Sequence, residues 1–149
     1  MLVDGRLRKA VLMVSRLVER VFRAVITRLN TGDPRPVVRL FANDARFVFP
    51  GESSFGGDHR GRAEIGAWFE RFAALGPHFT IHDVTVAGPP WNMRAAVQFS
   101  DRIAVPGGND YTNEGVIWLR MRWGRVLEDR TYLDTQRVAS LDAQLESAA

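Results

Sequence analysis

The residue whose type and setting best suit chemistry is a carboxylate, Asp129, in the last predicted strand. Side chains two residues apart share one face of a strand. Those on the face of Asp129 are Leu127, Thr131 and Leu133. A carboxylate among mostly apolar neighbours loses hydration, which raises its pKa and suits it to proton transfer near neutral pH. We therefore expect Asp129 to be a catalytic acid or base.

Two other interpretations of Asp129 stay open. It could pair with Arg102 or another arginine, which would make it part of a structural bridge. Alternatively, a strand register shifted by one residue would turn Asp129 outward and Glu128 inward.

Polar side chains on neighbouring strands are predicted to share the space beside Asp129. Strand alternation allows two registers, and in one of them Gln98 and Ser100 point inward from one strand and Asn113 inward from the next. Together with Thr131, these side chains could hydrogen-bond a carbonyl or hydroxyl oxygen of a substrate. The sequence therefore predicts a substrate-binding group made of amides and hydroxyls.

Two further residues could border the mouth of this space. Tyr111 opens its strand and could reach the rim. His59 lies beside Asp58 in the glycine-rich segment 51–61, where an Asp–His pair could act as a base. A solvated loop pair is the simpler interpretation of His59.

The sequence predicts no metal or organic cofactor. His78 and His82 are four residues apart, but strand alternation turns them away from the space beside Asp129, and no third ligand stands at a convincing spacing. The chain has no cysteine, which excludes disulfides and thiolate metal sites and fits a reducing, cytoplasmic compartment.

The elements that position these residues are predicted to form an α+β fold. Three predicted helices precede a meander of long strands, which is an α+β order. Apolar periodicity predicts helices over 7–30, from 34 to about 43, over 62–75 and over 136–146, and strands over 46–49, 79–87, 93–105, 111–123 and 125–135. A length of 149 residues fits a single domain, 1–149, in which 1–14 could extend the first helix.

Short connections make the consecutive long strands antiparallel neighbours. A curved antiparallel sheet covered by helices leaves a hollow, which is the usual place for a small ligand. The side of the sheet away from this hollow is also predicted to be apolar, with Val97, Phe99, Val116 and Trp118 on it. An apolar outer face favours a partner subunit, so we expect a homodimer.

Positive charge is concentrated at the start of the chain. The net charge is +3, and residues 1–31 contain seven basic and two acidic side chains. The rest of the chain is slightly acidic, which excludes a basic groove across the fold. We therefore interpret the first helix as having a solvated basic face, and we expect no nucleic-acid or membrane partner.

Three segments resemble a known superfamily in their order and spacing. They are Gly61-Arg62-Ala63-Glu64-Ile65 running into Trp68-Phe69, Gly124-Arg125-Val126-Leu127-Glu128, and Tyr132-Leu133-Asp134-Thr135. The pattern resembles the nuclear-transport-factor-like superfamily, in its SnoaL-like branch. The resemblance implies a cone-shaped α+β barrel, usually dimeric, with an apolar cavity that holds one or two carboxylates and needs no cofactor.

The catalytic patterns of some relatives are not matched. When the hairpin around Gly124 is aligned with limonene-type epoxide hydrolases without a gap, the positions of their three ionisable groups hold Gln98, Ser100 and Thr131, which argues against that reaction. The same alignment sets the register that turns Gln98 and Ser100 inward. The position of the ketosteroid-isomerase base holds Phe49, which cannot move a proton.

Three functions follow from the sequence. The first is a cofactor-free isomerase, cyclase or dehydratase that acts on an apolar cyclic molecule through Asp129. The second is a small-molecule-binding module without catalysis, which the missing family groups favour. The third is a dimeric interaction domain whose arginine-rich N-terminal helix docks on an acidic surface.

Overall fold

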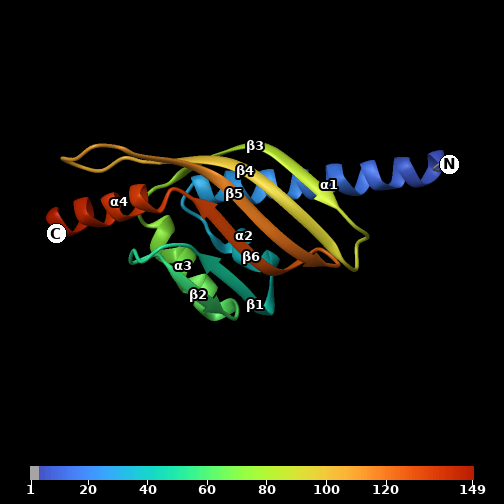
Figure 1. Ribbon diagram of the computed structural model, residues 1–149, viewed down its shortest axis with the longest axis horizontal. Coiled ribbons are helices and arrows are strands. Elements are labelled where there is room, and N and C mark those ends of the chain that lie inside the picture. Colours follow the sequence, from blue (N-terminus) through green and yellow to red (C-terminus); the bar gives the residue numbers. More distant parts are fainter. Residues whose placement is uncertain (1–3) are drawn as a thin grey trace.

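Figure 1 shows one curved sheet with helices packed along it; the computed structural model describes residues 4–149. The first three residues of the expected domain lie outside this range. The strands are β1 (Phe41–Phe49), β2 (Gly57–Arg60), β3 (His78–Ala87), β4 (Met93–Ile103), β5 (Tyr111–Arg122) and β6 (Arg125–Leu133). The helices are α1 (Gly5–Asn30), α2 (Arg35–Leu40), α3 (Arg62–Ala73) and α4 (Thr135–Ser147). The expected α+β class is confirmed, with three helices ahead of the four long strands.

The six strands lie in the order β2-β1-β6-β5-β4-β3. All neighbours are antiparallel except β1 and β6, which run parallel, so the sheet is mixed rather than antiparallel throughout. A parallel pair needs a long connection, and α3 with the β3–β5 meander provides it. The sheet stays open, with β2 and β3 at its edges. β2 forms inside the glycine-rich segment for which the sequence predicts a loop.

The second helix ends earlier than the sequence predicts. α2 stops at Leu40, and Phe41 already has extended backbone angles, φ −72° and ψ 141°. β1 then buries Phe41, Phe47 and Phe49. Burial of these aromatic side chains against the core outweighs the helical pattern that continues to Asn43, because propensity yields to tertiary packing.

The close approach of β5 to β6 depends on a glycine in β5. A Cβ atom at Gly115 would lie 2.1 Å from the carbonyl oxygen of Tyr132 and 2.9 Å from Cβ of Leu133. Only a residue without a side chain allows β5 and β6 to approach this closely.

Aromatic side chains fix α3 against β1. The ring of Phe47 meets Trp68 edge-on at a centroid distance of 4.7 Å and stacks on Phe69 at 5.6 Å. The indole Nε1 of Trp68 donates a hydrogen bond of 2.8 Å to the carbonyl oxygen of Phe55. Because its polar atom is satisfied, this large side chain can be buried without penalty.

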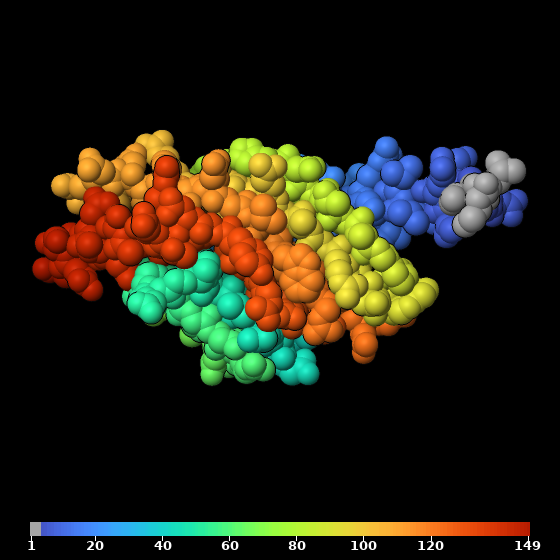
Figure 2. All heavy atoms as spheres, viewed as in Figure 1, coloured from blue at the N-terminus to red at the C-terminus, as the bar shows by residue number. Residues whose placement is uncertain are grey.

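The two halves of α1 have different surroundings. In the second half Phe22 and Leu29 are buried, and Asn30 exchanges hydrogen bonds of 2.9 and 2.7 Å with the backbone of Phe79 in β3. The first turns extend beyond the rest of the protein, as the blue atoms in Figure 2 show. No helix within residues 4–149 is long and apolar enough to cross a membrane.

The outer face of the sheet is less apolar than the sequence predicts. Val97 and Phe99 are buried on the inner face instead. Val116, Trp118 and an exposed Tyr132 remain on the outer face. The apolar outer face from which we expect a homodimer is therefore smaller than predicted. The homodimer stays an expectation.

Candidate functional site

A cavity of about 90 Å³ lies between the helices and the concave face of the sheet. Its walls include Phe22 and Leu29 from α1 and Phe69 from α3, with Leu119 from the sheet. Every lining side chain is a hydrocarbon except that of Asp129. The cavity therefore presents one ionisable group to whatever enters it.

A β-bulge sets the side chains that β6 presents to this cavity. Leu127 has no partner in the otherwise regular β5–β6 ladder, so it is the extra residue. As a result Val126 and Asp129, which are three residues apart, both line the cavity. Strict alternation predicts Leu127 in the place that Val126 occupies, and the bulge accounts for the difference.

Burial dominates the electrostatics of Asp129. Its residue surface is 6% exposed, and Oδ1 accepts one side-chain hydrogen bond of 3.1 Å, from the hydroxyl of Thr131. Loss of hydration raises the pKa of Asp129 to about 7, and the Thr131 hydrogen bond offsets part of this rise. The group is therefore divided between acid and carboxylate near neutral pH, so it can both give and accept a proton.

The two structural interpretations of Asp129 are wrong. Arg102 pairs with Asp110 instead. Glu128 faces outward, where its carboxylate lies 2.6 Å from Nε of Arg130. Asp129 points inward and forms no ion pair with Arg102 or any other arginine within residues 4–149.

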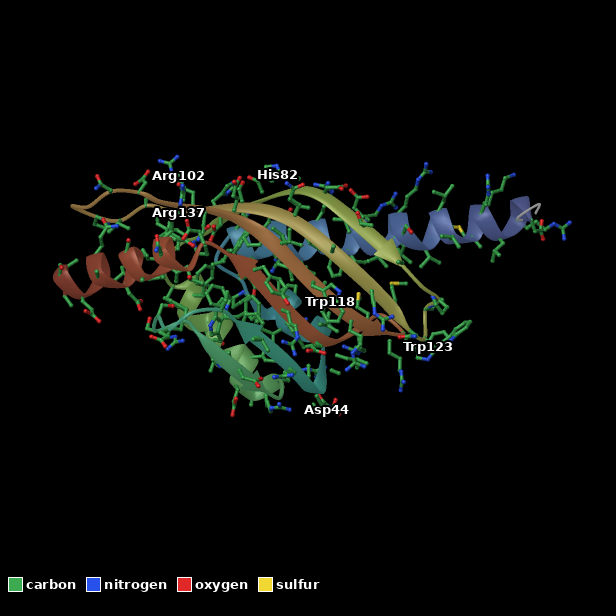
Figure 3. All side chains as sticks on the ribbon, in the orientation of Figure 1. Asp44, His82, Arg102, Trp118, Trp123 and Arg137 are labelled. Atoms are coloured by element: carbon green, nitrogen blue, oxygen red, sulfur yellow. The ribbon has the colours of Figure 1, made fainter. Side chains whose placement is uncertain are left out.

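The predicted positions of Gln98 and Ser100 are also wrong. Gln98 is exposed, and Oγ of Ser100 lies 2.8 Å from Nε2 of His82 on β3, away from the cavity (Figure 3 labels His82). Val97 pairs with Ile117, and these two side chains line the cavity. β4 therefore faces the core with its odd-numbered residues, which is the opposite of the prediction.

A second buried carboxylate, which the sequence analysis did not single out, follows from this register. Asp101 is 5% exposed, and its Oδ1 is buried without a hydrogen-bond partner. Burial raises its pKa to about 7 as well. Asp101 does not line the cavity. The sequence signal was present, because an acid interrupts the alternating apolar series Ala95, Val97, Phe99 and Ile103.

Asn113 and Tyr111 lie near Asp101 rather than at the cavity. Asn113 is the direct neighbour of Asp101 across the β4–β5 ladder. Its Nδ2 donates 3.0 Å to the hydroxyl of Tyr111 and 2.8 Å to the carbonyl oxygen of Asp134. Burial, followed by the charge of Asp101, raises the pKa of Tyr111. Asn113 thus ties β5 to the residue that caps α4, which is a structural role.

His59 lies on β2, beside Phe47, with a ring-centroid distance of 5.8 Å. Its Nε2 is buried without a partner, whereas Asp58 pairs with Arg46 at 2.8 Å. The Asp–His pair is therefore not formed. Phe47 stands between His59 and Asp129 in the ladder, so His59 does not contact the carboxylate.

Residues 4–149 bring together no group of three or more side chains that could hold a metal ion. Of the predicted site residues, the structure joins Asp129 and Thr131 at one place and Tyr111 and Asn113 at another. Gln98 and Ser100 lie on the outer face, and His59 lies two strands from Asp129.

The sequence matches the SnoaL-like domain over residues 22–128, which is most of the chain. The protein therefore belongs to the SnoaL-like domain family, within the nuclear-transport-factor-like superfamily. No curated protein matches the sequence.

Solved structures agree with this assignment of the fold. An NTF2-like protein of unknown function from Burkholderia pseudomallei has a TM-score of 0.72 at 19% identity, over 84% of this chain and 96% of that one. TerC, co-crystallised with polyporic acid, has a TM-score of 0.69 at 18% identity, over 85% and 98%. SalBIII, an epoxide hydrolase/cyclase-like enzyme in pyran ring formation in the polyether salinomycin, has a TM-score of 0.67 at 15% identity, over 82% and 94%. At these identities the likeness is one of fold.

Proposed function

We propose that the protein is a cofactor-free enzyme of the isomerase, cyclase or dehydratase type, with Asp129 as its general acid and base. The observation that carries this proposal is the single carboxylate, with a pKa raised to about 7, in the wall of a hydrocarbon cavity. An unpaired buried acid is costly to stability, and such groups are concentrated at functional sites. The SnoaL-like fold and the likeness to an epoxide hydrolase/cyclase-like enzyme support the same class.

The lining restricts the substrate class. Hydrocarbon walls select an apolar molecule, and a lone acid can serve one oxygen function, such as a ketone, a phenol or an alcohol. A dry cavity of about 150 Å³ is enough for benzene. The present cavity of about 90 Å³ is smaller, so a cyclic substrate requires its walls to move apart. We therefore propose a substrate of one ring rather than a polycyclic one.

In the proposed mechanism, protonated Asp129 donates to the substrate oxygen, or its carboxylate removes a proton from an adjacent carbon. The hydroxyl of Thr131, which bonds Oδ1 at 3.1 Å, holds the carboxyl in one orientation. The hydrocarbon walls exclude water, which strengthens the interaction between the acid and the substrate oxygen.

A second candidate is a binding module without catalysis. It is favoured by the outward positions of Gln98 and Ser100, which leave the cavity with few polar groups to orient a reaction. In this case Asp129 would hold a ligand oxygen by one hydrogen bond, and no product would form.

A thermal-shift screen separates the two candidates. Wild type and Asp129→Asn are each tested with monocyclic ketones, phenols and epoxides, and Asp101→Asn serves as the matched control. A ligand at a hundred times its dissociation constant adds about 2.7 kcal/mol of stability. We expect a shift in wild type and in Asp101→Asn, followed by turnover that Asp129→Asn loses.

Binding without turnover in any of the three proteins would favour the binding module. Turnover that persists in Asp129→Asn would contradict the role of Asp129. If no compound shifts any of the three melting temperatures, the small-molecule proposal fails.

A further inference from the structure

One end of the molecule carries apolar and basic side chains that the described chain leaves uncovered. We call this end the amphipathic tip. It consists of the first turns of α1 (5–16), the β3–β4 connection (88–92) and the Trp123-Gly124 turn between β5 and β6. Figure 1 shows the three segments at the same end, and Figure 3 places Trp123 at the end opposite Arg102.

A groove of about 430 Å³ lies between the first turns of α1 and the β3–β4 connection. Its apolar lining is open to solvent: Leu7 is 58% exposed, Val11 55% and Trp91 57%. Because burial of apolar surface is favourable, a groove of this kind gains free energy when an apolar partner fills it.

Two tryptophans project from the tip. The rings of Trp91 and Trp123 have a centroid distance of 6.0 Å, and the backbone N–H of Trp123 donates 2.7 Å to the carbonyl oxygen of Pro90. Trp123 has φ +49°, a left-handed conformation that is costly for a bulky residue, and it is 66% exposed. Trp123 and Gly124 both have positive φ, as a two-residue hairpin turn of this kind requires, and the turn holds a large aromatic side chain in water.

The helix at the tip carries cations that no described acid neutralises. They are Arg6, Arg8, Lys9, Arg16 and Arg20, all of them exposed. Glu19, the acid on this helix, pairs with Arg23 instead, at 3.0 Å. Arg94 and Arg122 add exposed positive charge on the strands that lead to the tip. The partner of the tip is therefore expected to be anionic as well as apolar.

We propose that the amphipathic tip binds an anionic lipid surface, with α1 lying in the interface and the two tryptophans at headgroup level. An amphipathic helix with basic residues on its polar face, beside exposed tryptophans, fits such a surface. A second copy fits poorly, because a symmetric dimer would bring the same cations together. A nucleic acid would meet the cations but leave the apolar groove uncovered.

This proposal revises the expectation of a solvated helix face. Viewed by itself, the first helix is compatible with that expectation, because its cations can face water. The structure adds the groove and the tryptophan pair beside the helix, although Trp91 and Trp123 each follow the first turns of α1 (5–16) by more than 70 residues in the sequence.

The test measures sedimentation of the full chain with vesicles, together with its tryptophan fluorescence. One set of vesicles is phosphatidylcholine, and the other is an equimolar mixture of phosphatidylcholine and phosphatidylglycerol. We expect binding to the mixed vesicles alone, with a blue shift of the emission. The double change Trp91→Ser and Trp123→Ser should abolish the shift. Each cation near an anionic surface contributes about 1 kcal/mol, so changing Arg6, Arg8 and Lys9 to Gln should weaken binding on the order of 100-fold.

The matched controls lie elsewhere on the molecule. Arg102→Gln removes an exposed cation at the opposite end, and Tyr132→Ser removes an exposed aromatic from the outer face of the sheet. Both variants should bind the mixed vesicles as wild type does. Because all the changed residues are exposed, the melting temperature should stay unchanged in every variant.

Several outcomes would overturn the proposal. They are equal binding to both vesicles, no binding to the mixed vesicles, and full binding by the triple Gln variant. A DNA duplex that binds the tip when vesicles do not would assign the surface to nucleic acid. A dimer in size-exclusion chromatography that the double Ser variant abolishes, without vesicle binding, would assign it to a second copy.

Discussion

Asp129 and Asp101 are both buried acids on the concave side of one sheet, and burial raises the pKa of each to about 7. Their surroundings differ. Asp129 lines a hydrocarbon cavity and accepts a hydrogen bond from Thr131, whereas Asp101 lies beside Asn113 and Tyr111 with one oxygen unpartnered. Their neighbours on β5 are six residues apart, which separates the two acids by about 20 Å along the strand.

The comparison shows that a raised pKa is not enough to locate a reactive site. Both acids are poised to exchange protons near neutral pH, but the spaces beside them differ. Asp129 lines an apolar cavity, whereas Asp101 borders an open depression of about 500 Å³ whose lining residues are all polar. An apolar cavity is the usual place for a small organic ligand. A substitution of Asp129 or of its neighbour should therefore affect activity, stability or pKa differently from the matched substitution at Asp101, except where burial alone decides the outcome.

The largest expected difference is in catalysis. With a substrate found by the thermal-shift screen, Asp129→Asn should lower kcat by roughly 10²–10⁴-fold, because the proton-transfer group is lost. Asp101→Asn should keep kcat within about threefold of wild type, because Asp101 does not line the cavity. The measurement is steady-state turnover at neutral pH. Equal losses of kcat in the two variants would show that lining the cavity gives Asp129 no special catalytic role.

The next effect concerns stability against pH, and here the two acids should behave alike. Because each folded-state pKa is raised from 3.8 to about 7, the folded protein keeps a proton that the unfolded chain releases as pH rises above 4. The free energy of unfolding should therefore fall between pH 4 and pH 7. Each acid contributes about 1.4 kcal/mol per pH unit at most.

Either Asn variant should remove about half of this slope. Urea unfolding at several pH values between 4 and 7 measures it. A wild-type stability that rises with pH across this range would contradict the raised pKa of both acids.

A smaller effect should come from enlarging the space beside each acid. Leu119→Ala, beside Asp129, and Ile103→Ala, in the strand of Asp101, should each destabilise the fold by about 3 kcal/mol, because both side chains are buried. Only Leu119→Ala should also gain affinity for larger rings, since Leu119 lines the cavity. Calorimetric titration with monocyclic and bicyclic ketones gives the comparison. Equal ligand affinities in the two variants would contradict the assignment of the cavity.

The smallest effect is on the pKa itself. The Thr131 hydroxyl stabilises the charged form of Asp129, so Thr131→Val should raise the pKa of Asp129 further. The pKa of Asp101 should stay as it is in wild type. Carboxyl chemical shifts followed by NMR titration resolve the two groups. A lower pKa for Asp129 in this variant would show that Thr131 does not stabilise its charged form.

Much of the fold could be predicted because its signals are local. The amphipathic period of α1 and the apolar alternation of the long strands are visible in the sequence, and the end of α1 at Asn30 matches the prediction. The early end of α2 at Leu40 could not be seen, because it depends on where Phe47 packs against α3. The parallel pairing of β1 with β6 is likewise a long-range contact.

The site was harder to predict, because it depends on register. Asp129 faces the cavity as the alternation of β6 suggests, but the bulge at Leu127 that brings Val126 in beside it has no clear sequence signal. The inward face of β4 is visible in the sequence. Its apolar residues are odd-numbered, and this alternation places Gln98 outside and Asp101 inside. The resemblance to family patterns gave the opposite face when it was applied without a gap.

α1 joins the two regions proposed to function. Its second half supplies Phe22 and Leu29 to the cavity wall, and its first half supplies Leu7 and Val11 to the groove of the amphipathic tip. A helix of 26 residues is about 39 Å long and is stiff over that length. It therefore sets the spacing between the two regions. A protein whose tip binds a lipid surface as proposed holds its cavity at a fixed distance from that surface.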